Sequence, residues 1–362
     1  MRGGTCRSGG DCGATHEPGV KPPGRHAAIT LRSVAERAGV SAMTVSNVIN
    51  RRGKVGKDTI ARVKAAIREL GYVPNVAARQ LVGARGTKVG LIYADRRTPF
   101  LDAILIGALQ ATTARGLQLM IRGGTGQSRE EATALAQDLA AAGAEALLLI
   151  PPYAELLSGT AELHRLAMPV AAIAAGSGLP DMATVRIDNR AAMREITRLV
   201  LTRGPHRIGF VAGPFSHGDS VERLLGFRDA LAEARIAFHD ELMVEGRFTF
   251  DSGVEAARTL FALPEPPRAI IASNDDMAVG VIAEAQRRGL RLPDQLIVTG
   301  FDDTNVASRV WPPLSVIRQP IEEMAFRATE LLIEALDAGR TAAGGDEIHP
   351  HQLIERESTA AQ

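Results

Sequence analysis

The sequence predicts two parts of different fold class, an all-α helix-turn-helix headpiece and a larger α/β region with parallel sheets. Two short apolar stripes of helical spacing, separated by one glycine, lie within residues 30–50. From residue 88 to residue 358, short apolar runs alternate with helical periods, which is the pattern of βαβ units. The charge divides at the same place: residues 1–88 contain 16 Lys and Arg against 5 Asp and Glu, whereas the remainder contains 26 against 36. A basic head on an acidic body suits contact with a polyanion, although a solvated face gives the same pattern.

Residues 30–50 are predicted to form two short helices joined by a tight turn. The first helix carries one apolar stripe, formed by Leu31, Val34, Ala35 and Ala38. Gly39 suits the turn because it adopts positive φ without a Cβ clash, and the hydroxyl of Ser41 can cap the second helix. The apolar stripe of the second helix consists of Val45, Val48 and Ile49. Its opposite face has the size that a DNA major groove admits. That face presents Ala42, Met43, Ser46, Asn47 and Asn50.

A third helix is predicted from Asp58 onward, with apolar residues at helical spacing and Gly71 as its C-terminal cap. The segment 51–57, RRGKVGK, lies between the second and third helices, is strongly basic and includes Lys54. It suits contact with a phosphate backbone, which fixes position without reading bases; a solvated loop is the alternative. Three helices with a small shared core predict a domain over residues 28–73.

Residues 71–83, GYVPNVAARQLVG, predict a further short helix. Pro74 prevents continuation of the preceding helix, and Asn75 can cap a new helix of about eight residues. A helix shorter than ~12 residues is marginal alone in water, so we expect this one to order only against a partner. Leu81 is its exposed apolar residue, of the type that wedges between base steps in a minor groove; a linker with a chance leucine is the alternative. We assign residues 74–87 to this hinge helix and linker.

Beyond residue 88 the pattern predicts parallel strands with helices on both faces of the sheet. Strands are expected at 89–94, 117–121, 146–151, 169–173, 183–187, 207–213, 269–273, 296–301 and 314–317. Helices are expected near 100–115, 129–142, 155–166, 190–203, 221–236, 252–261, 277–288 and 322–337. These strands are too many for one compact unit of this length, so two sheets are expected.

Residues just after these strands are candidates for a ligand site, because ligands of open α/β sheets bind beyond the carboxyl ends of the strands. Arg223, Asn274 and Asp302 can exchange hydrogen bonds with hydroxyl groups. Phe100 and Phe248 offer aromatic faces, and the combination suits a polyhydroxylated ligand. Each residue also has a structural alternative, since Asn–Asp pairs commonly cap helices and phenylalanine is usually in the core. Asp188, in the sequence RIDN, is a further candidate.

Several functional classes lack their motifs in this sequence. There is no GxSxG elbow, P-loop or HExxH motif, and GGTG at 123–126 does not have the spacing of a dinucleotide fingerprint. Cys6 and Cys12 have no metal-ligand spacing, so neither a metal nor a cofactor is expected. Residues 1–27 predict a disordered leader without the apolar region of a signal peptide; a start codon assigned too early gives the same segment. No apolar run approaches the ~20 residues of a membrane span.

Residues 30–83 resemble the lactose-repressor (LacI/GalR) family of bacterial transcription regulators. The similarity lies in TVSNVIN at 44–50, ELGYVPN at 69–75 and AARQL at 77–81, and it continues to about residue 358. The resemblance implies that Ala42 and Met43 read bases, with Asn47 as a further reader. It implies phosphate contacts for Thr44, Ser46 and Asn50, and a minor-groove position for Leu81 with Ala78 beside it. Because Ala42 and Met43 cannot make a bidentate hydrogen bond to a base, Asn47 is the best candidate for polar readout. Gly56 stands where the family usually has a serine that caps the third helix.

The resemblance also implies two lobes like those of a periplasmic sugar-binding protein, linked by three crossovers. We place the crossovers near 187–190, 316–319 and 344–347. Lobe one then covers about 88–188 and 317–345, and lobe two covers about 189–316 and 346–358. Arg223, Phe248, Asn274 and Asp302 fall at the effector-contacting positions of the family. At Ala174 and Ala175 the family often has Asp-Arg, so the effector of a relative cannot be carried over.

The sequence thus predicts a DNA-binding transcription regulator, a repressor, that acts as a homodimer on a near-palindromic operator. A small-molecule effector, a sugar, is expected to bind between the two lobes and to control DNA binding. We expect a cytoplasmic, nucleoid-associated protein that is not an enzyme. Two other classes stay open. A periplasmic-type sugar carrier would need a signal peptide, and a sugar-processing enzyme would need catalytic carboxylates in the cleft.

Overall fold

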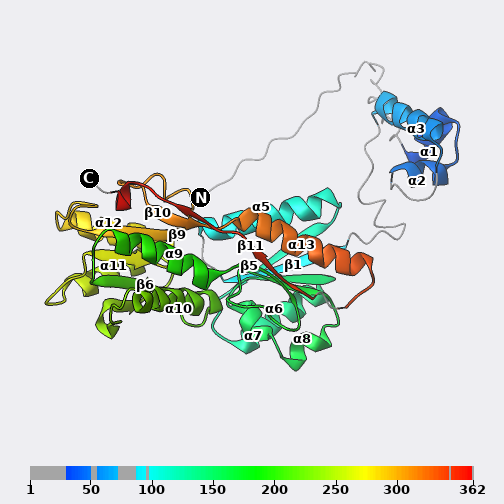
Figure 1. The fold of residues 1–362 in the computed structure, drawn as a ribbon. Coiled ribbons are helices and arrows are strands. Elements are labelled where there is room, and N and C mark those ends of the chain that lie inside the picture. The colour runs from blue at the N-terminus through cyan, green and yellow to red at the C-terminus, as the bar shows by residue number, and fades with distance from the viewer. Residues whose placement is uncertain (1–29, 50–54, 72–86, 95–97, 342–343, 361–362) are drawn as a thin grey trace, which may run out of the picture. The chain divides into compact units, whose positions relative to one another are not determined.

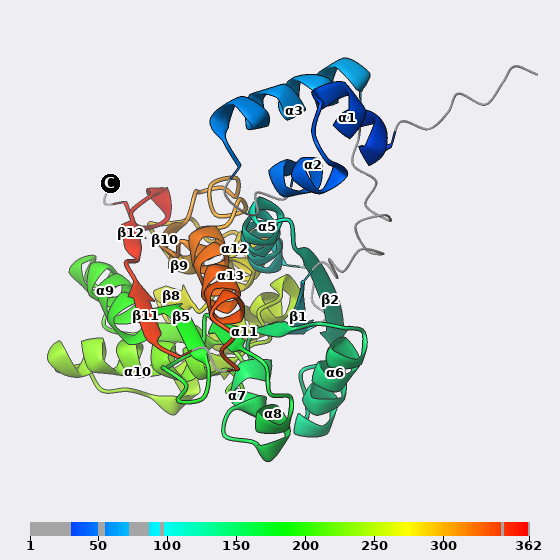
Figure 2. The ribbon, with the colours of Figure 1, turned by 90° about the vertical axis from the view of Figure 1, so that its right-hand side faces the viewer.

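Two compact units make up the described part of the chain. The computed structural model describes residues 30–49, 55–71, 87–94, 98–341 and 344–360. The units meet in sequence at residues 85 and 86. Figures 1 and 2 show a small helical unit and a larger unit in which helices surround two sheets. The predicted leader, 1–27, and the predicted hinge segment, 74–87, lie outside the described residues except for Thr87.

The small unit consists of α1 (Leu31–Ala38), α2 (Ala42–Ile49) and α3 (Lys57–Leu70). Thr30 and Ser33 form a reciprocal capping box at the start of α1, and Gly39 ends this helix with φ of +63°. Arg37 of α1 donates to the carboxylate of Glu69 on α3 at 2.6 Å, which ties the two helices at the surface. The shared core is small and apolar, as the stripes predict. Its buried members are Val34, Ala35, Ala38, Val45, Val63 and Ala66.

The larger unit contains two six-stranded sheets, which define lobe one and lobe two. The sheet of lobe one has the order β11 (Asp346–His349), β5 (Ala183–Ile187), β4 (Val170–Ile173), β3 (Ala146–Leu149), β1 (Lys88–Ala94) and β2 (Gln118–Gly124). The sheet of lobe two has the order β12 (Gln352–Ile354), β10 (Ser315–Arg318), β9 (Ile297–Asp302), β8 (Ala269–Ala272), β6 (Ile208–Ala212) and β7 (Met243–Glu245). All neighbouring strands are parallel except β10 and β12.

Helices cover both faces of each sheet. Lobe one has α5 (Pro99–Ala114), α6 (Arg129–Ala141), α7 (Tyr153–Leu157), α8 (Ala161–Arg165) and α13 (Ile321–Asp337). Lobe two has α9 (Asn189–Thr202), α10 (Gly218–Glu233), α11 (Phe250–Phe261) and α12 (Asp275–Arg287). Two single-turn helices, η1 (Asp240–Leu242) and η2 (Glu357–Thr359), also belong to this unit. In β3, Leu148 packs into one core and Leu147 and Leu149 into the other, as the alternation of side chains along a strand requires.

Helices α5 and α13 lie side by side in both views of the ribbon (Figures 1 and 2). Their close approach depends on Gly107 of α5. A Cβ on this residue would lie 2.2 Å from the backbone oxygen of Glu322 on α13. Among the described helices, none has the length and apolar character needed to cross a membrane.

The nine predicted strands are confirmed to within a few residues, but three short strands were not predicted. These are β7, β11 and β12, which contain three or four residues each and are edge strands with partly exposed side chains. Because such strands bury little apolar surface, they have no continuous apolar run in the sequence. The predicted helix over 155–166 is two helices, α7 and α8, separated at Gly159, which has φ of +72°.

The chain passes between the lobes after β5, after β10 and between β11 and β12. The third crossover therefore lies within 349–352 and not at the expected 344–347. Residues 346–349 belong to lobe one rather than lobe two, because they pair with β5. Arg186 on β5 reinforces this pairing by donating two hydrogen bonds to the carboxylate of Asp346, at 2.9 and 2.8 Å.

Candidate functional site

The outer face of α2 presents the predicted base-reading residues to solvent. Val45 is fully buried, whereas Met43 is 69% exposed and Ala42 is also exposed. Thr44, Ser46 and Asn47 are partly exposed. The start of α2 is held by Ser41, whose Oγ accepts a hydrogen bond from the backbone N–H of Thr44 at 3.1 Å. The arrangement leaves a short polar and apolar surface on one side of a capped helix. The other predicted DNA-contacting residues, Asn50, Lys54, Ala78 and Leu81, lie outside the described residues.

A cavity lies between the two lobes, at the carboxyl ends of several strands. Its space, including the open mouth, is about 740 Å³. Lobe one and lobe two both contribute to its walls, so its shape depends on how the lobes are placed. The lining residues are Tyr93, Ala94, Thr98, Phe100, Leu101, Ile150, Pro151, His217, Arg223, Phe248, Asn274, Asp275, Asp276, Asp302 and Thr304. Five of the six predicted effector residues are in this list, which follows from the rule that strand ends gather at one edge.

Asp188 is the exception and does not line the cavity. Its side chain is exposed, and its Oδ1 accepts a hydrogen bond from the backbone N–H of Ala191 at 2.9 Å. β5 leads directly into α9, so the carboxylate serves as the N-terminal cap of that helix. The structural alternative therefore accounts for Asp188, which caps α9 and is absent from the cavity wall.

Arg223 of α10 is held rigidly in the cavity wall, with only 2% of its surface exposed. Its Nε donates to Oδ1 of Asn189 at 2.9 Å, and its Nη1 donates to the backbone oxygen of Ser273 at 2.5 Å. Its Nη2 lies 3.1 Å from the carboxylate of Asp219. The guanidinium also stacks 3.9 Å from the ring centre of Phe301. These contacts fix the orientation of the guanidinium group. A guanidinium held in one orientation can form hydrogen bonds of defined geometry with a ligand.

Asp302 faces Arg223 from the end of β9. The two charged groups are 4.0 Å apart, and Gln319 donates to Oδ1 of Asp302 at 2.6 Å. Burial raises the pKa of Asp302 to about 7, although Arg223 and Gln319 both act to lower it. Asp302 has φ of +107°, an uncommon conformation for this residue type, and so the backbone turns sharply at the cavity. Gln319 is the first residue of the crossover that follows β10. Its hydrogen bond to Asp302 therefore connects the cavity wall to this crossover.

Asn274 and Phe248 form a second linked pair in lobe two. Asn274 caps α12, its Oδ1 accepting from the backbone N–H of Met277 at 3.0 Å. Its Nδ2 donates to the backbone oxygen of Phe248 at 3.2 Å, and Phe248 has φ of +58°. The ring of His217 meets the ring of Phe248 edge to face, with 5.5 Å between ring centres. The capping alternative for Asn274 therefore holds, and the cap also places an aromatic ring at the cavity.

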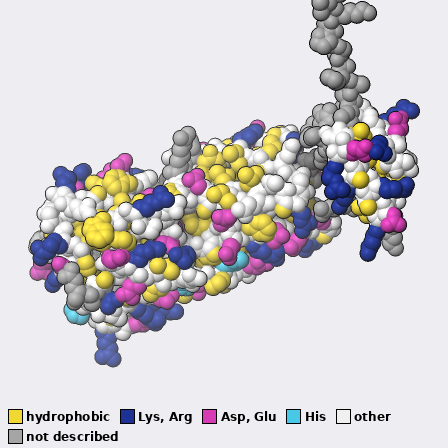
Figure 3. All heavy atoms as spheres, turned by 90° about the horizontal axis from the view of Figure 1, so that it is seen from above, with side chains coloured by type: hydrophobic (Ala, Val, Ile, Leu, Met, Phe, Trp, Pro, Cys, Tyr) yellow, Lys and Arg dark blue, Asp and Glu magenta, His cyan; other side chains and the backbone are white. Residues whose placement is uncertain are grey.

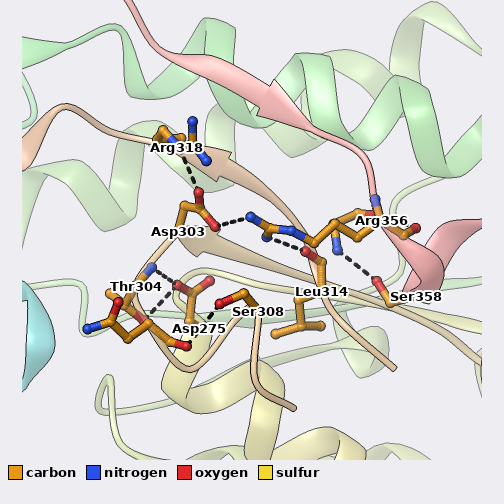
Figure 4. Close-up of polar contacts among 10 residues, drawn as sticks. Asp275, Asp303, Thr304, Ser308, Leu314, Arg318, Arg356 and Ser358 are labelled. Carbon is orange, nitrogen blue, oxygen red and sulfur yellow. Dashed lines mark hydrogen bonds and ion pairs between the residues drawn. The ribbon is translucent and has the colours of Figure 1, made fainter. Parts of the chain in front are cut away.

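Two carboxyl groups at the start of α12 complete this side of the cavity. Oδ2 of Asp275 accepts from both the backbone N–H and the hydroxyl of Thr304, at 2.7 and 2.9 Å (Figure 4). Burial, and then the charge of Asp302, raise the pKa of Asp275 well above its ordinary value. Burial also raises the pKa of Asp276. Asp276, like Asp302, therefore brings a carboxyl group to the cavity that can exchange hydrogen bonds with hydroxyl groups.

Asp303, the residue after Asp302, links the end of β10 to the segment that follows β12. Figure 4 shows its carboxylate between Arg318, at the end of β10, and Arg356, which follows β12. Nε of Arg318 and Nη2 of Arg356 donate to it at 2.6 and 2.7 Å. Arg356 also donates to the backbone oxygen of Leu314 at 2.8 Å. Two adjacent residues at the end of β9 thus have different roles: Asp302 lines the cavity, and Asp303 binds Arg318 at the start of the second crossover.

Several cavity residues were not among the predicted site residues. Tyr93 lies near the end of β1, Thr98 directly precedes α5, and Asp276 lies in the first turn of α12. The rule that strand ends gather could have found these three, as it indicates Asp275, which directly follows Asn274. His217 stands five residues after the end of β6, so the strand-end rule does not indicate it. Gln319, which donates to Asp302 from behind the cavity lining, directly follows β10. Ala174 and Ala175, where a polar pair was noted as missing, are buried.

Comparison with known proteins places this chain in a family. Residues 30–75 match the model of bacterial regulatory proteins of the lacI family, and residues 197–359 match a periplasmic binding protein-like domain. The HTH-type transcriptional regulator CelR of Thermobifida fusca is 33% identical over 341 residues, which cover 91% of this chain and 98% of that protein. The chain belongs to the lacI family of bacterial regulatory proteins. This lacI-family protein is accordingly a DNA-binding transcription regulator, as its sequence predicts.

Solved structures agree with this assignment. The transcriptional regulator CelR in complex with cellobiose is 32% identical, with a TM-score of 0.67, and the match covers 91% of this chain and 99% of that one. The Lac repressor dimer bound to operator and the anti-inducer ONPF is 25% identical, with a TM-score of 0.72, and the match covers 92% and 99%. The lacI-family regulator therefore has the predicted fold, a helix-turn-helix headpiece and a two-lobed periplasmic-binding-protein-like domain.

Proposed function

We propose that this lacI-family regulator is a repressor that binds a near-palindromic operator as a homodimer in the bacterial cytoplasm, and that a sugar controls this binding. The observation that carries the proposal is the joint presence of two sites in one chain. One is the exposed face of α2, and the other is a cavity between two lobes that contains a buried Arg223 facing Asp302.

The proposed operator contacts follow the exposed face of α2. Ala42 and Met43 would contact thymine methyl groups, and Asn47 would read a base through its amide. Thr44, Ser46, Asn50 and Lys54 would contact phosphates and set the position of the helix. Leu81, with Ala78 beside it, would wedge into the minor groove. Asn47→Ala should relax the base preference at one position of each half-site, whereas Lys54→Ala should weaken all sequences equally.

The proposed effector is a sugar because the cavity combines polar groups with rings. The guanidinium of Arg223 and the carboxyls of Asp276 and Asp302 can exchange hydrogen bonds with hydroxyl groups. Phe100 and Phe248 can pack on the apolar face of a sugar ring. A related regulator, CelR, has been solved with cellobiose, which makes β-linked disaccharides the first compounds to test.

The proposed homodimer uses an apolar surface on lobe one. Ile106 and Leu109 of α5 are 47% and 55% exposed, and Ile121 on the edge strand β2 is 44% exposed. Figure 3 looks onto the side of the larger unit along which α5 runs, and hydrophobic side chains gather there. Exposed apolar patches of this kind commonly mark contacts between proteins. Leu109→Glu should convert the dimer to a monomer in analytical ultracentrifugation.

The proposed switch couples the cavity to the hinge segment 74–87. Closing of the lobes on an effector would move the points where the two hinge helices of a dimer attach. A ligand changes such an equilibrium only through its different affinity for the two states, typically ~1–3 kcal/mol of coupling. This coupling would suffice to change the affinity for the operator by about 5- to 150-fold.

Gel shifts on the DNA upstream of the gene for this protein test the proposal. The wild type should retard one fragment in preference to random duplex, and one sugar of a panel that includes cellobiose should change that affinity. Arg223→Lys should keep operator binding and lose the sugar response. Leu81→Ala should weaken operator binding. Equal retardation of specific and random duplex, with and without every sugar, would contradict the proposed function.

A further inference from the structure

The two lobes touch at the backbone of two glycines. Gly176 follows β4 of lobe one, and Gly218 is the first residue of α10 in lobe two. A Cβ added to Gly176 would lie 2.2 Å from the carbonyl carbon of Gly218 and 2.4 Å from its oxygen. Since ordinary carbon contacts are about 3.5–4.0 Å, any side chain at Gly176 requires the lobes to separate at this point.

Glu155 of α7 joins the same contact from lobe one. Its Oε1 accepts a hydrogen bond from the backbone N–H of Gly218 at 3.3 Å. The backbone N–H groups of Gly218 and Gly176 both act to lower the pKa of Glu155, so this carboxyl faces the backbone of both glycines. Its Oε2 is buried and has no hydrogen-bond partner among the described residues. The carboxyl group of Glu155 therefore faces the contact between the lobes rather than solvent.

This contact lies next to the ligand-facing arginine in sequence and in space. Asp219 follows Gly218, and its Oδ2 is 3.1 Å from Nη2 of Arg223. The charge of Asp219 also acts on Glu155, whose pKa burial raises to about 7. Movement of the start of α10 relative to lobe one would thus break the contact of Glu155 and carry the partner of Arg223 with it.

We propose that Gly176, Gly218 and Glu155 form a clasp that holds the two lobes closed over the cavity. The three crossovers join the lobes covalently, and the clasp adds a contact between lobe one and the start of α10 that can open and close. This inference deepens the proposed function and rests on it, because a clasp matters only if lobe closure controls DNA binding. Glycine at position 176 is needed for the backbones to meet, an added Cβ at Gly218 would be tight against Glu155 and Gly176, and Glu155 supplies the polar link.

Distance measurements in the full chain test the clasp without any ligand. Spin labels would be placed on exposed positions of the two lobes, by Arg165→Cys on α8 and Asp240→Cys in lobe two. The only native cysteines, Cys6 and Cys12, would be changed to serine. Double electron–electron resonance then reports the distribution of distances between lobes. Gly176→Ala should lengthen the mean distance by more than about 1 Å, since the added carbon must move from 2.2 Å to an ordinary contact.

Matched variants separate the clasp from a general effect of substitution. Gly344→Ala should leave the distribution unchanged, because an added Cβ there meets nothing within 4 Å. Glu155→Ala should lengthen and broaden the distribution, whereas Glu155→Gln should preserve it, since a carboxamide oxygen can accept from Gly218. Identical distributions for the wild type, Gly176→Ala and Glu155→Ala would overturn the clasp. That result would not affect the gel-shift test of operator binding. Conversely, failure to select an operator in the gel shift would overturn the proposed function without changing the measured distances between the lobes.

Discussion

Glu155→Gln should change how the stability of the larger unit depends on pH. In the folded protein, burial and the charge of Asp219 raise the pKa of Glu155 from its ordinary value of 4.5 to about 7, although hydrogen bonds from backbone N–H groups act to lower it. Between these values the folded state holds a proton that the unfolded chain has released. The free energy of unfolding of the wild type therefore falls as pH rises through this window, and it becomes level above the folded pKa. Glutamine carries no titratable proton and removes this term.

The expected size follows from the same two values. Each pKa unit corresponds to about 1.4 kcal/mol, so the rise from 4.5 to about 7 corresponds to at most about 3.5 kcal/mol. Relative to the wild type, Glu155→Gln should gain about 2–3 kcal/mol of stability on going from pH 4.5 to pH 8. Other groups that titrate in this window, such as Asp302, are present in both proteins, and their contribution cancels in the difference.

Urea unfolding at closely spaced pH values, followed by circular dichroism of the full chain, measures this difference. Glu265→Gln is the matched control, since Glu265 is exposed in the loop after α11 and should follow the wild type at every pH. If the stability of Glu155→Gln runs parallel to that of the wild type within about 0.5 kcal/mol across the range, the buried carboxyl is not linked to folding as argued.

Three further substitutions have expected outcomes. Gly107→Ala should destabilise the larger unit by about 1–3 kcal/mol, because the added Cβ would lie 2.2 Å from the backbone of α13; an unchanged urea midpoint would contradict this packing. Gly56→Ser should stabilise the small unit by about 0.3–0.5 kcal/mol, because Gly56 caps α3 without a side-chain bond and nothing obstructs a Cβ there; calorimetry of the wild type and variant provides the check. Asp303→Asn should cost about 2–3 kcal/mol, because Arg318 and Arg356 lose a shared, nearly buried carboxylate; unchanged stability would mean that these ion pairs contribute little.

Local patterns in the sequence determined most of the fold. The stripes of 30–50, together with Gly39 and Ser41, predict α1 and α2 because helix periodicity, a positive-φ turn and a cap are short-range properties. The apolar runs predict the central strands, which are buried on both faces and therefore need no alternation. The sequence analysis also assigned Arg223 and Asp302 to one ligand site, and both line the cavity although 79 positions separate them in the numbering.

Only the tertiary structure decided the roles that depend on distant partners. Asp188 and Asn274 both follow buried strands and both cap helices, yet only Asn274 reaches the cavity. The short edge strand β11 belongs to lobe one because it pairs with β5, and no local pattern encodes that pairing. Gly176 and Gly218 meet because they lie on two lobes that contact each other. The sequence does not show which distant backbone segment packs against a given glycine. Periodicity and capping act over a few residues, whereas sheet edges and lobe contacts depend on chain segments that are far apart until the protein folds.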